Sequence, residues 1–158
     1  KIKILKDEGI VVFLNICGDG PLKESIRRKI IEKNMTSQII LNKTKKHDEL
    51  FSLIRNSDIF AISSVSEGFP MAPAEAMVLG TPVIATKVGG IPELIEDGKT
   101  GFLIETGNHE DLIKKINQVF DQPAVASNMG SKGKEIIQKK FNWDNIAKKF
   151  VLILNQNL

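Results

Sequence analysis

The chain has 158 residues, 42% hydrophobic and 26% charged, which suits one globular domain with a core of its own. It contains no run of about 18 apolar residues, so we expect no transmembrane helix. The net charge is only +3, the basic residues are scattered and aromatic residues are few, which argues against a nucleic-acid partner and favours an anionic small ligand or an anionic membrane surface.

Cysteine and histidine are too scarce for several kinds of site. Cys17 is the only cysteine, which excludes an intrachain disulfide and a cysteine-rich zinc site and suits a reducing cytoplasm. His47 and His109 are too few and too far apart to predict a metal site. The sequence begins Lys-Ile-Lys-Ile, without an initiator Met or a signal-peptide pattern, so we expect it to be part of a longer polypeptide.

Strand-like and helix-like segments alternate along the chain. Short apolar runs predict strands at Val11–Cys17, Gln38–Leu41, Asp58–Ser63, Pro82–Thr86 and Gly101–Ile104. Helices are predicted at Leu22–Lys33, His47–Asn56, Ala72–Leu79, Pro92–Glu96, Glu110–Phe120, Pro123–Lys140 and Trp143–Asn155. This alternation predicts a single α/β domain over residues 1–158, with a doubly wound, Rossmann-like parallel sheet and helices at the C-terminus.

The connections between these elements are asymmetric. Helices lead into strands through plain turns, such as the one in which Gly80 is expected to end a helix. Strands lead into helices through loops with unusual residues, at 18–21, 42–46, 63–70 and 86–91. Because ligands of open parallel sheets bind outside the carboxyl ends of the strands, these loops predict the ligand edge. The alternative is that all four are ordinary turns.

The first of these loops, Gly18-Asp19-Gly20-Pro21, opens a helix. Gly18 and Gly20 would let the backbone approach a phosphate or sugar at the helix N-terminus. The position of a third glycine in a dinucleotide fingerprint is taken by Lys23, and the chain has no Walker A motif. A ligand contact and a tight turn without a ligand are therefore both open.

Two glutamates flank the loop after the third predicted strand. Glu67 lies in the loop, and we expect Glu75 in the first turn of the next helix, because Pro73 is tolerated only near a helix start. Two carboxylates beside a rim of backbone N–H donors could bind the hydroxyls and phosphates of a sugar nucleotide. The alternative is that Glu67 is a loop charge and Glu75 a helix-start acid, worth about 0.3 to 1 kcal/mol through the helix dipole.

A second anion-binding turn is expected at Thr86–Glu93. Gly89 and Gly90 could expose N–H groups to a phosphate, and Lys87 could add charge or be solvated. Glu93 is interpreted as a helix-start residue rather than a catalytic acid.

Together these motifs resemble a known family. Ile16-Cys17-Gly18-Asp19-Gly20-Pro21, Ser66-Glu67-Gly68-Phe69-Pro70, Glu75-Ala76-Met77, Gly80-Thr81-Pro82-Val83-Ile84-Ala85 and Gly89-Gly90-Ile91-Pro92-Glu93 resemble the C-terminal half of family-4 retaining glycosyltransferases of the GT-B fold. The resemblance covers nearly the whole chain. Its most specific part is the E-x7-E spacing from Glu67 to Glu75.

The resemblance implies a domain that binds a nucleotide-sugar donor linked to UDP, GDP or ADP. Glu67, the candidate catalytic residue, would bind hydroxyls of the donor sugar, and Glu75 would bind the ribose. The nucleotide would lie beside Gly18 and Gly20, with its base near Leu41 and Asn42. The sugar and diphosphate would lie along the loop of Gly68, Phe69, Pro70, Met71 and Ala72. Pro70 has no N–H to donate. Asn42 stands where many relatives have glycine.

The resemblance also implies a cytoplasmic hexosyltransferase of polysaccharide or glycolipid assembly, with neither metal nor cofactor, since the nucleotide-sugar is a substrate. A saccharide or glycolipid acceptor would bind through an N-terminal domain that this chain lacks, as it lacks the first strand and its diphosphate clamp. We therefore expect the fragment alone to be inactive. Peripheral association of the full-length protein with the inner face of the membrane is left open. The alternatives are a GT-B-fold sugar-nucleotide epimerase and a non-catalytic nucleotide-binding module.

Overall fold

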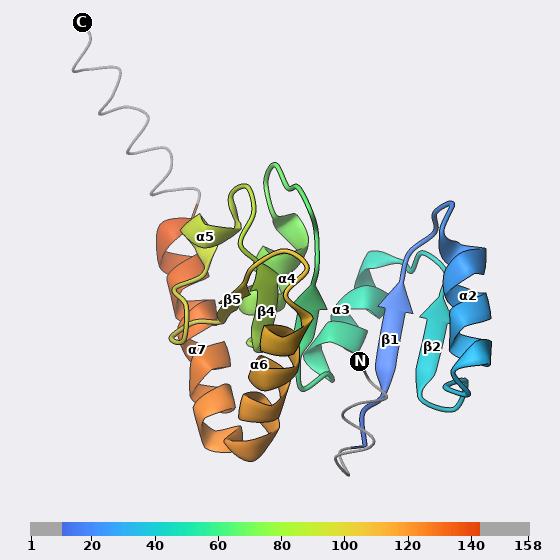
Figure 1. Cartoon of the computed structure of the whole chain (residues 1–158). Coiled ribbons are helices and arrows are strands. Elements are labelled where there is room, and N and C mark those ends of the chain that lie inside the picture. The colour runs from blue at the N-terminus through green and yellow to red at the C-terminus, as the bar shows by residue number, and fades with distance from the viewer. Residues whose placement is uncertain (1–10, 143–158) are drawn as a thin grey trace, which may run out of the picture. The chain divides into compact units, whose positions relative to one another are not determined.

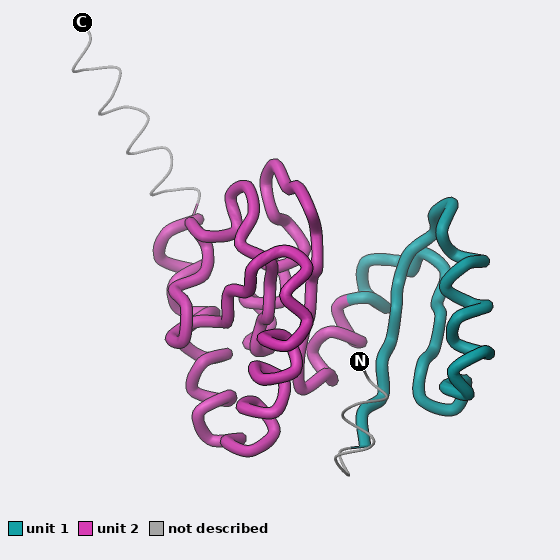
Figure 2. The backbone as a smooth tube through the Cα atoms, in the orientation of Figure 1, with its two compact units in different colours: residues 1–50 teal, residues 51–158 magenta. Residues whose placement is uncertain are grey.

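The computed structural model describes residues 11–142. The chain divides into two compact units, residues 1–50 and 51–158 (Figure 2). The last predicted helix, Trp143–Asn155, lies outside the described residues.

The first unit is built on one pair of parallel strands (Figure 1). Strand β1 (Leu14–Cys17) is followed by helix α2 (Lys23–Glu32) and strand β2 (Ile39–Asn42). Leu14 lies opposite Ile39 and Cys17 opposite Asn42, so both strands end at the same edge. The loops after β1 and β2 therefore start side by side. Helix α3 (His47–Arg55) begins in this unit and ends in the next.

The second unit holds a three-stranded parallel sheet in the order β3–β4–β5. Its elements are β3 (Phe60–Ile62), α4 (Met71–Val78), β4 (Val83–Thr86), α5 (Ile91–Leu94), β5 (Phe102–Ile104), α6 (His109–Asp121) and α7 (Pro123–Lys140), as Figure 1 shows. Strand β3 pairs with β4 and β4 with β5, so neighbours in the sheet are consecutive in the sequence.

Strand β4 is the buried centre of the second unit. Ile84 lies in a core cluster with residues of β5, α6 and α7, among them Phe102, Val119 and Met129. Val83 and Ala85 point to the opposite face by the alternation of a strand, and both are fully buried. Both faces of β4 are thus covered, which is the doubly wound arrangement.

Helix α4 ends through the glycine that the sequence indicates. Gly80 has φ +80°, its N–H donates to the Met77 carbonyl, and the Thr81 N–H donates to the Ala76 carbonyl. This pair of bonds is a Schellman motif, which satisfies the last carbonyls of the helix and turns the chain into β4.

The parallel α/β class predicted from the sequence is confirmed, and each predicted strand and helix within residues 11–142 is present. The strands pair in two sheets, of two and three strands, whereas we expected one sheet. The first strand is also shorter than predicted, because pairing starts at Leu14, and Val11 and Phe13 are each 69% exposed.

Candidate functional site

The loop after β3 carries Glu67, which is half-buried. The Ser64 hydroxyl donates to Glu67 Oε1 over 2.5 Å. A hydrogen bond to an ionised acceptor is stronger than one between neutral groups, so this contact fixes the carboxylate as well as the turn. Within the residues that the structure describes, Glu67 Oε2 makes no such bond.

The loop after β4 packs against the loop of Glu67. Gly89 has φ +52°, and a Cβ at this position would lie 1.8 Å from the Glu67 carbonyl oxygen. A Cβ on Gly90 would lie 3.1 Å from the Gly68 carbonyl oxygen and 3.2 Å from Pro70 Cδ. Glycine at 89 is therefore required both by the left-handed backbone and by the close approach of the two loops.

A buried threonine joins the same two loops. Thr86, the last residue of β4, is 1% exposed, and its hydroxyl donates to the Ser64 carbonyl over 2.7 Å. Lys87, which follows it, is exposed, and its Nζ lies 3.9 Å from Glu105 Oε1. An exposed ion pair of this kind contributes little to stability.

Glu75 lies on α4, one residue further into the helix than the sequence suggested. The helix begins at Met71 instead of Ala72, so Glu75 is its fifth residue, and the first turn holds no acidic residue. The expectation that Glu75 lies in the first turn is therefore wrong, and with it the helix-dipole interpretation loses its support, because that effect fades beyond the first turn. Glu75 is half-buried. Pro73 does lie in the first turn, as expected.

The segment between the two glutamates is partly exposed. A Cβ on Gly68 would meet nothing within 4 Å, and Phe69 is 62% exposed with its ring edge-on to Phe141. Pro70 is buried and precedes the helix. The Met71 N–H donates to the Phe69 carbonyl over 2.9 Å, so this predicted ligand donor is already used within the loop.

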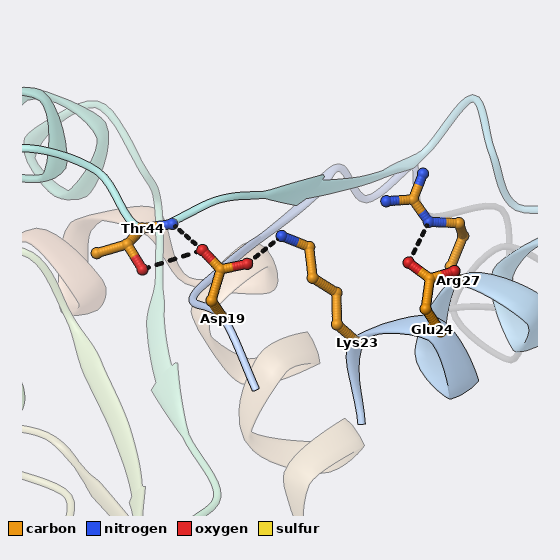
Figure 3. A network of polar contacts seen from close by, with 5 residues as sticks. All are labelled: Asp19, Lys23, Glu24, Arg27 and Thr44. Atoms are coloured by element: carbon orange, nitrogen blue, oxygen red, sulfur yellow. Dashed lines mark hydrogen bonds and ion pairs between the residues drawn. The ribbon is translucent and has the colours of Figure 1, made fainter. Parts of the chain in front are cut away.

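In the first unit, one carboxylate ties together the loops after β1 and β2 (Figure 3). Asp19 accepts hydrogen bonds from the Lys23 ammonium, from the Thr44 N–H over 3.0 Å and from the Thr44 hydroxyl over 3.2 Å. The bond from Lys23, followed by the bonds from Thr44, lowers the pKa of the Asp19 carboxyl from 3.8 to about 2. The loop after β1 is thus held by Asp19 and not by its glycines alone.

The other predicted residues of the first unit lie at or just after the ends of β1 and β2. Gly18 has φ +143°, which favours glycine, whereas Gly20 has open space where a Cβ would lie. Leu41 and Asn42 end β2, and the Asn42 amide donates to the Asn15 side chain over 3.2 Å.

Between residues 11 and 142, no three His, Cys, Asp or Glu side chains gather as metal ligands would. In the same range no helix is both long and apolar enough to cross a membrane.

The sequence profile of glycosyl transferases group 1 matches residues 2–136. The chain belongs to this family. It is 38% identical over 129 residues to the uncharacterized glycosyltransferase MJ1178 of Methanocaldococcus jannaschii, a match that covers 82% of the chain and 36% of the relative. The chain thus spans about a third of the length of the curated relatives it matches first.

Solved structures agree with this assignment. A mutant of TarM from Staphylococcus aureus, in complex with fondaparinux, α-GlcNAc-glycerol and UDP, is 29% identical with a TM-score of 0.83, over 96% of this chain and 30% of TarM. Anabaena HepE in complex with UDP is 25% identical with a TM-score of 0.81, over 92% of this chain and 41% of HepE. The predicted glycosyltransferase family and GT-B fold are confirmed.

In this group 1 glycosyltransferase chain the predicted site residues fall into two sets. Residues 67–72 and Glu75 form one strand-to-helix passage in the second unit, and Gly18, Gly20, Leu41 and Asn42 lie at the strand ends of the first unit. Sequence reasoning missed Ser64, Thr86 and the contacts of Asp19. The only signal for them was their position at or just after the carboxyl end of a strand.

Proposed function

We propose that this chain is the donor-binding domain of a retaining glycosyltransferase that moves a sugar from a nucleotide-sugar to a saccharide or lipid-linked acceptor. The observation that carries the proposal is the passage from Glu67 to Glu75, where a hydrogen-bonded carboxylate in the loop after β3 is followed by a second carboxylate on α4. Retention of configuration and independence from metal are supported by the family resemblance. The acceptor would bind to another part of the complete protein.

We further propose that the nucleotide is UDP, because the TarM and HepE structures both contain it. Glu75 would bind the ribose hydroxyls and Glu67 the hydroxyls of the sugar, since carboxylates only accept hydrogen bonds and hydroxyls donate them. Gly68 and Phe69 would present the backbone N–H groups nearest to the diphosphate.

Calorimetric titration of the complete protein tests the proposal. UDP, GDP and ADP are compared first, followed by UDP-glucose, UDP-galactose, UDP-N-acetylglucosamine, GDP-mannose and ADP-glucose. We expect UDP and one UDP-sugar to bind. The absence of binding by every nucleotide at millimolar concentration would refute a donor domain.

Two substitutions separate the roles of the glutamates. Glu75→Ala should weaken both the diphosphate and the nucleotide-sugar by about tenfold or more, because a hydrogen bond to a charged group is worth about 1.5–3 kcal/mol. Glu67→Gln should weaken only the nucleotide-sugar. Glu110→Ala, which removes an exposed acid in the first turn of α6, is the matched control and should change neither affinity.

An assay of the reaction distinguishes a transferase from the fold's other activities. The complete protein should transfer the sugar, or hydrolyse the donor slowly when no acceptor is present. Release of a 2-epimer would identify an epimerase instead. Donor binding without any turnover in the presence of acceptors would identify a binding module.

A further inference from the structure

We propose that Ser64 and Thr86 are positioning residues, which hold the Glu67 carboxylate in the orientation that it needs to bind the donor sugar. This inference rests on the proposed function of Glu67 and extends it to two residues that do not touch the ligand. Three contacts at the ends of β3 and β4 carry it.

The first contact is between Ser64 and the carboxylate itself. At 2.5 Å, the bond from the Ser64 hydroxyl to Glu67 Oε1 is short, as expected for a hydroxyl that donates to an ionised acceptor. It occupies Oε1 from within the chain and leaves Oε2 for a ligand hydroxyl. A carboxylate on a loop would otherwise sample several rotamers, and ordering one of them costs binding free energy.

The second contact fixes Ser64. Thr86 ends the strand whose four residues are all buried, and it is itself 1% exposed. Its hydroxyl donates to the Ser64 carbonyl over 2.7 Å. The backbone from which the Ser64 hydroxyl projects is therefore anchored to a strand that is buried along its whole length.

The third contact fixes the backbone of Glu67. Because Gly89 lacks a Cβ, the loop after β4 packs directly on the Glu67 carbonyl. The carbonyl is thus held from the side of β4, and the carboxylate is held by Ser64. Two loops that follow neighbouring strands act together on one side chain.

The test measures the dissociation constant of the nucleotide-sugar divided by that of the matching nucleoside diphosphate. A loss of stability alone would not change this ratio. It uses the complete protein and the tightest binder among UDP-glucose, UDP-galactose, UDP-N-acetylglucosamine, GDP-mannose and ADP-glucose, together with the matching nucleoside diphosphate. Ser64→Ala should weaken the nucleotide-sugar about tenfold and leave the diphosphate within about twofold, because only the sugar contact depends on Glu67. Ser64→Thr, which keeps the hydroxyl, should restore most of the loss.

Thr86→Val should move the same ratio in the same direction, and Thr86→Ser should restore it. The chain offers a matched control in Thr81, which precedes the same strand. Thr81 is 4% exposed, and its hydroxyl donates to the Ile54 carbonyl over 3.0 Å, so Thr81→Val removes the same kind of bond at the opposite edge. It should lower the melting temperature similarly and leave the ratio unchanged.

A double-mutant cycle completes the test. If Ser64 acts through Glu67, then Ser64→Ala adds no further loss in a Glu67→Gln background. Equal ratios in wild type, Ser64→Ala and Thr86→Val would overturn the positioning role, as would a change in Thr81→Val equal to that in Thr86→Val. If Glu67→Gln itself leaves the ratio unchanged, the proposed role of Glu67 fails, and that outcome is distinct from the first two.

Discussion

Gly89→Ala tests whether the contact between the loops after β3 and β4 supports the fold. The new Cβ would lie 1.8 Å from the Glu67 carbonyl oxygen and 2.7 Å from its carbon, where real Cβ atoms stay beyond 3.0 Å. The obstructing atoms are backbone, so the loops must separate by about 1 Å. Overpacking of this kind costs about 1–3 kcal/mol, and an alanine in the left-handed region adds about 1 kcal/mol.

The expected destabilisation of about 2–4 kcal/mol corresponds to a melting temperature lowered by roughly 5 to 15 °C for a chain of this size. Thermal unfolding followed by circular dichroism measures it. Gly68→Ala is the matched control from the facing loop, since its Cβ would meet nothing within 4 Å and no left-handed φ is required there. The control should melt within about 2 °C of wild type. If Gly89→Ala and Gly68→Ala melt together, the two loops do not pack as described.

Two further predictions concern the other end of β4 and the first unit. Gly130→Ala on α7 would place a Cβ 2.0 Å from the Gly80 carbonyl oxygen and should lower the free energy of unfolding, measured in urea, by about 1–3 kcal/mol. Alanine is otherwise favoured over glycine in a helix by about 1 kcal/mol, so a stabilised variant would contradict the close packing. The pKa of Asp19 is lowered from 3.8 to about 2, so its ionised form stabilises the fold fully above about pH 4, and this contribution is lost as the pH falls toward 2. The melting temperatures of wild type and Asp19→Asn should therefore converge between pH 4 and pH 2, and a constant difference across that window would show that the charge of Asp19 plays no part.

The local elements of this fold follow closely from the sequence. Glycine and proline mark the turn from α4 into β4, because Gly80 takes a left-handed backbone and Pro82 cannot continue a helix. Alternating strands and helices predict a parallel sheet, since two parallel strands need a crossover connection of about a dozen residues or more, usually with a helix. The pattern of apolar residues does not show which residues of a strand pair with a neighbouring strand. A run such as Val11–Cys17 is equally apolar whether or not a partner strand lies beside every residue of it, and the structure pairs only its second half.

The position of the candidate site could be predicted from the sequence, but the hydrogen bonds and packing contacts that hold its residues could not. Glu67 stands out because a carboxylate beside Gly-Phe-Pro has no evident structural role in a loop, and Glu75 stands out through its E-x7-E spacing from Glu67. Ser64 and Thr86 do not stand out, because a hydroxyl near a strand end is common, and its partner depends on how two loops distant in sequence meet. Gly89 was assigned to phosphate binding on sequence grounds, which stays a prediction. The structure adds a packing reason for the same glycine.

The order β3–β4–β5 has a consequence for how the second unit folds. Phe60 pairs with Val83 and Ile84 with Phe102, so paired residues lie 23 and 18 positions apart in the sequence. The entropy of closing such short loops is modest, and proteins rich in near-neighbour contacts fold quickly. As the chain leaves the ribosome, β4 finds its partner β3 already synthesised, and β5 finds β4. The loops that carry Glu67 and Gly89 are therefore brought together by a pairing between near neighbours in the sequence.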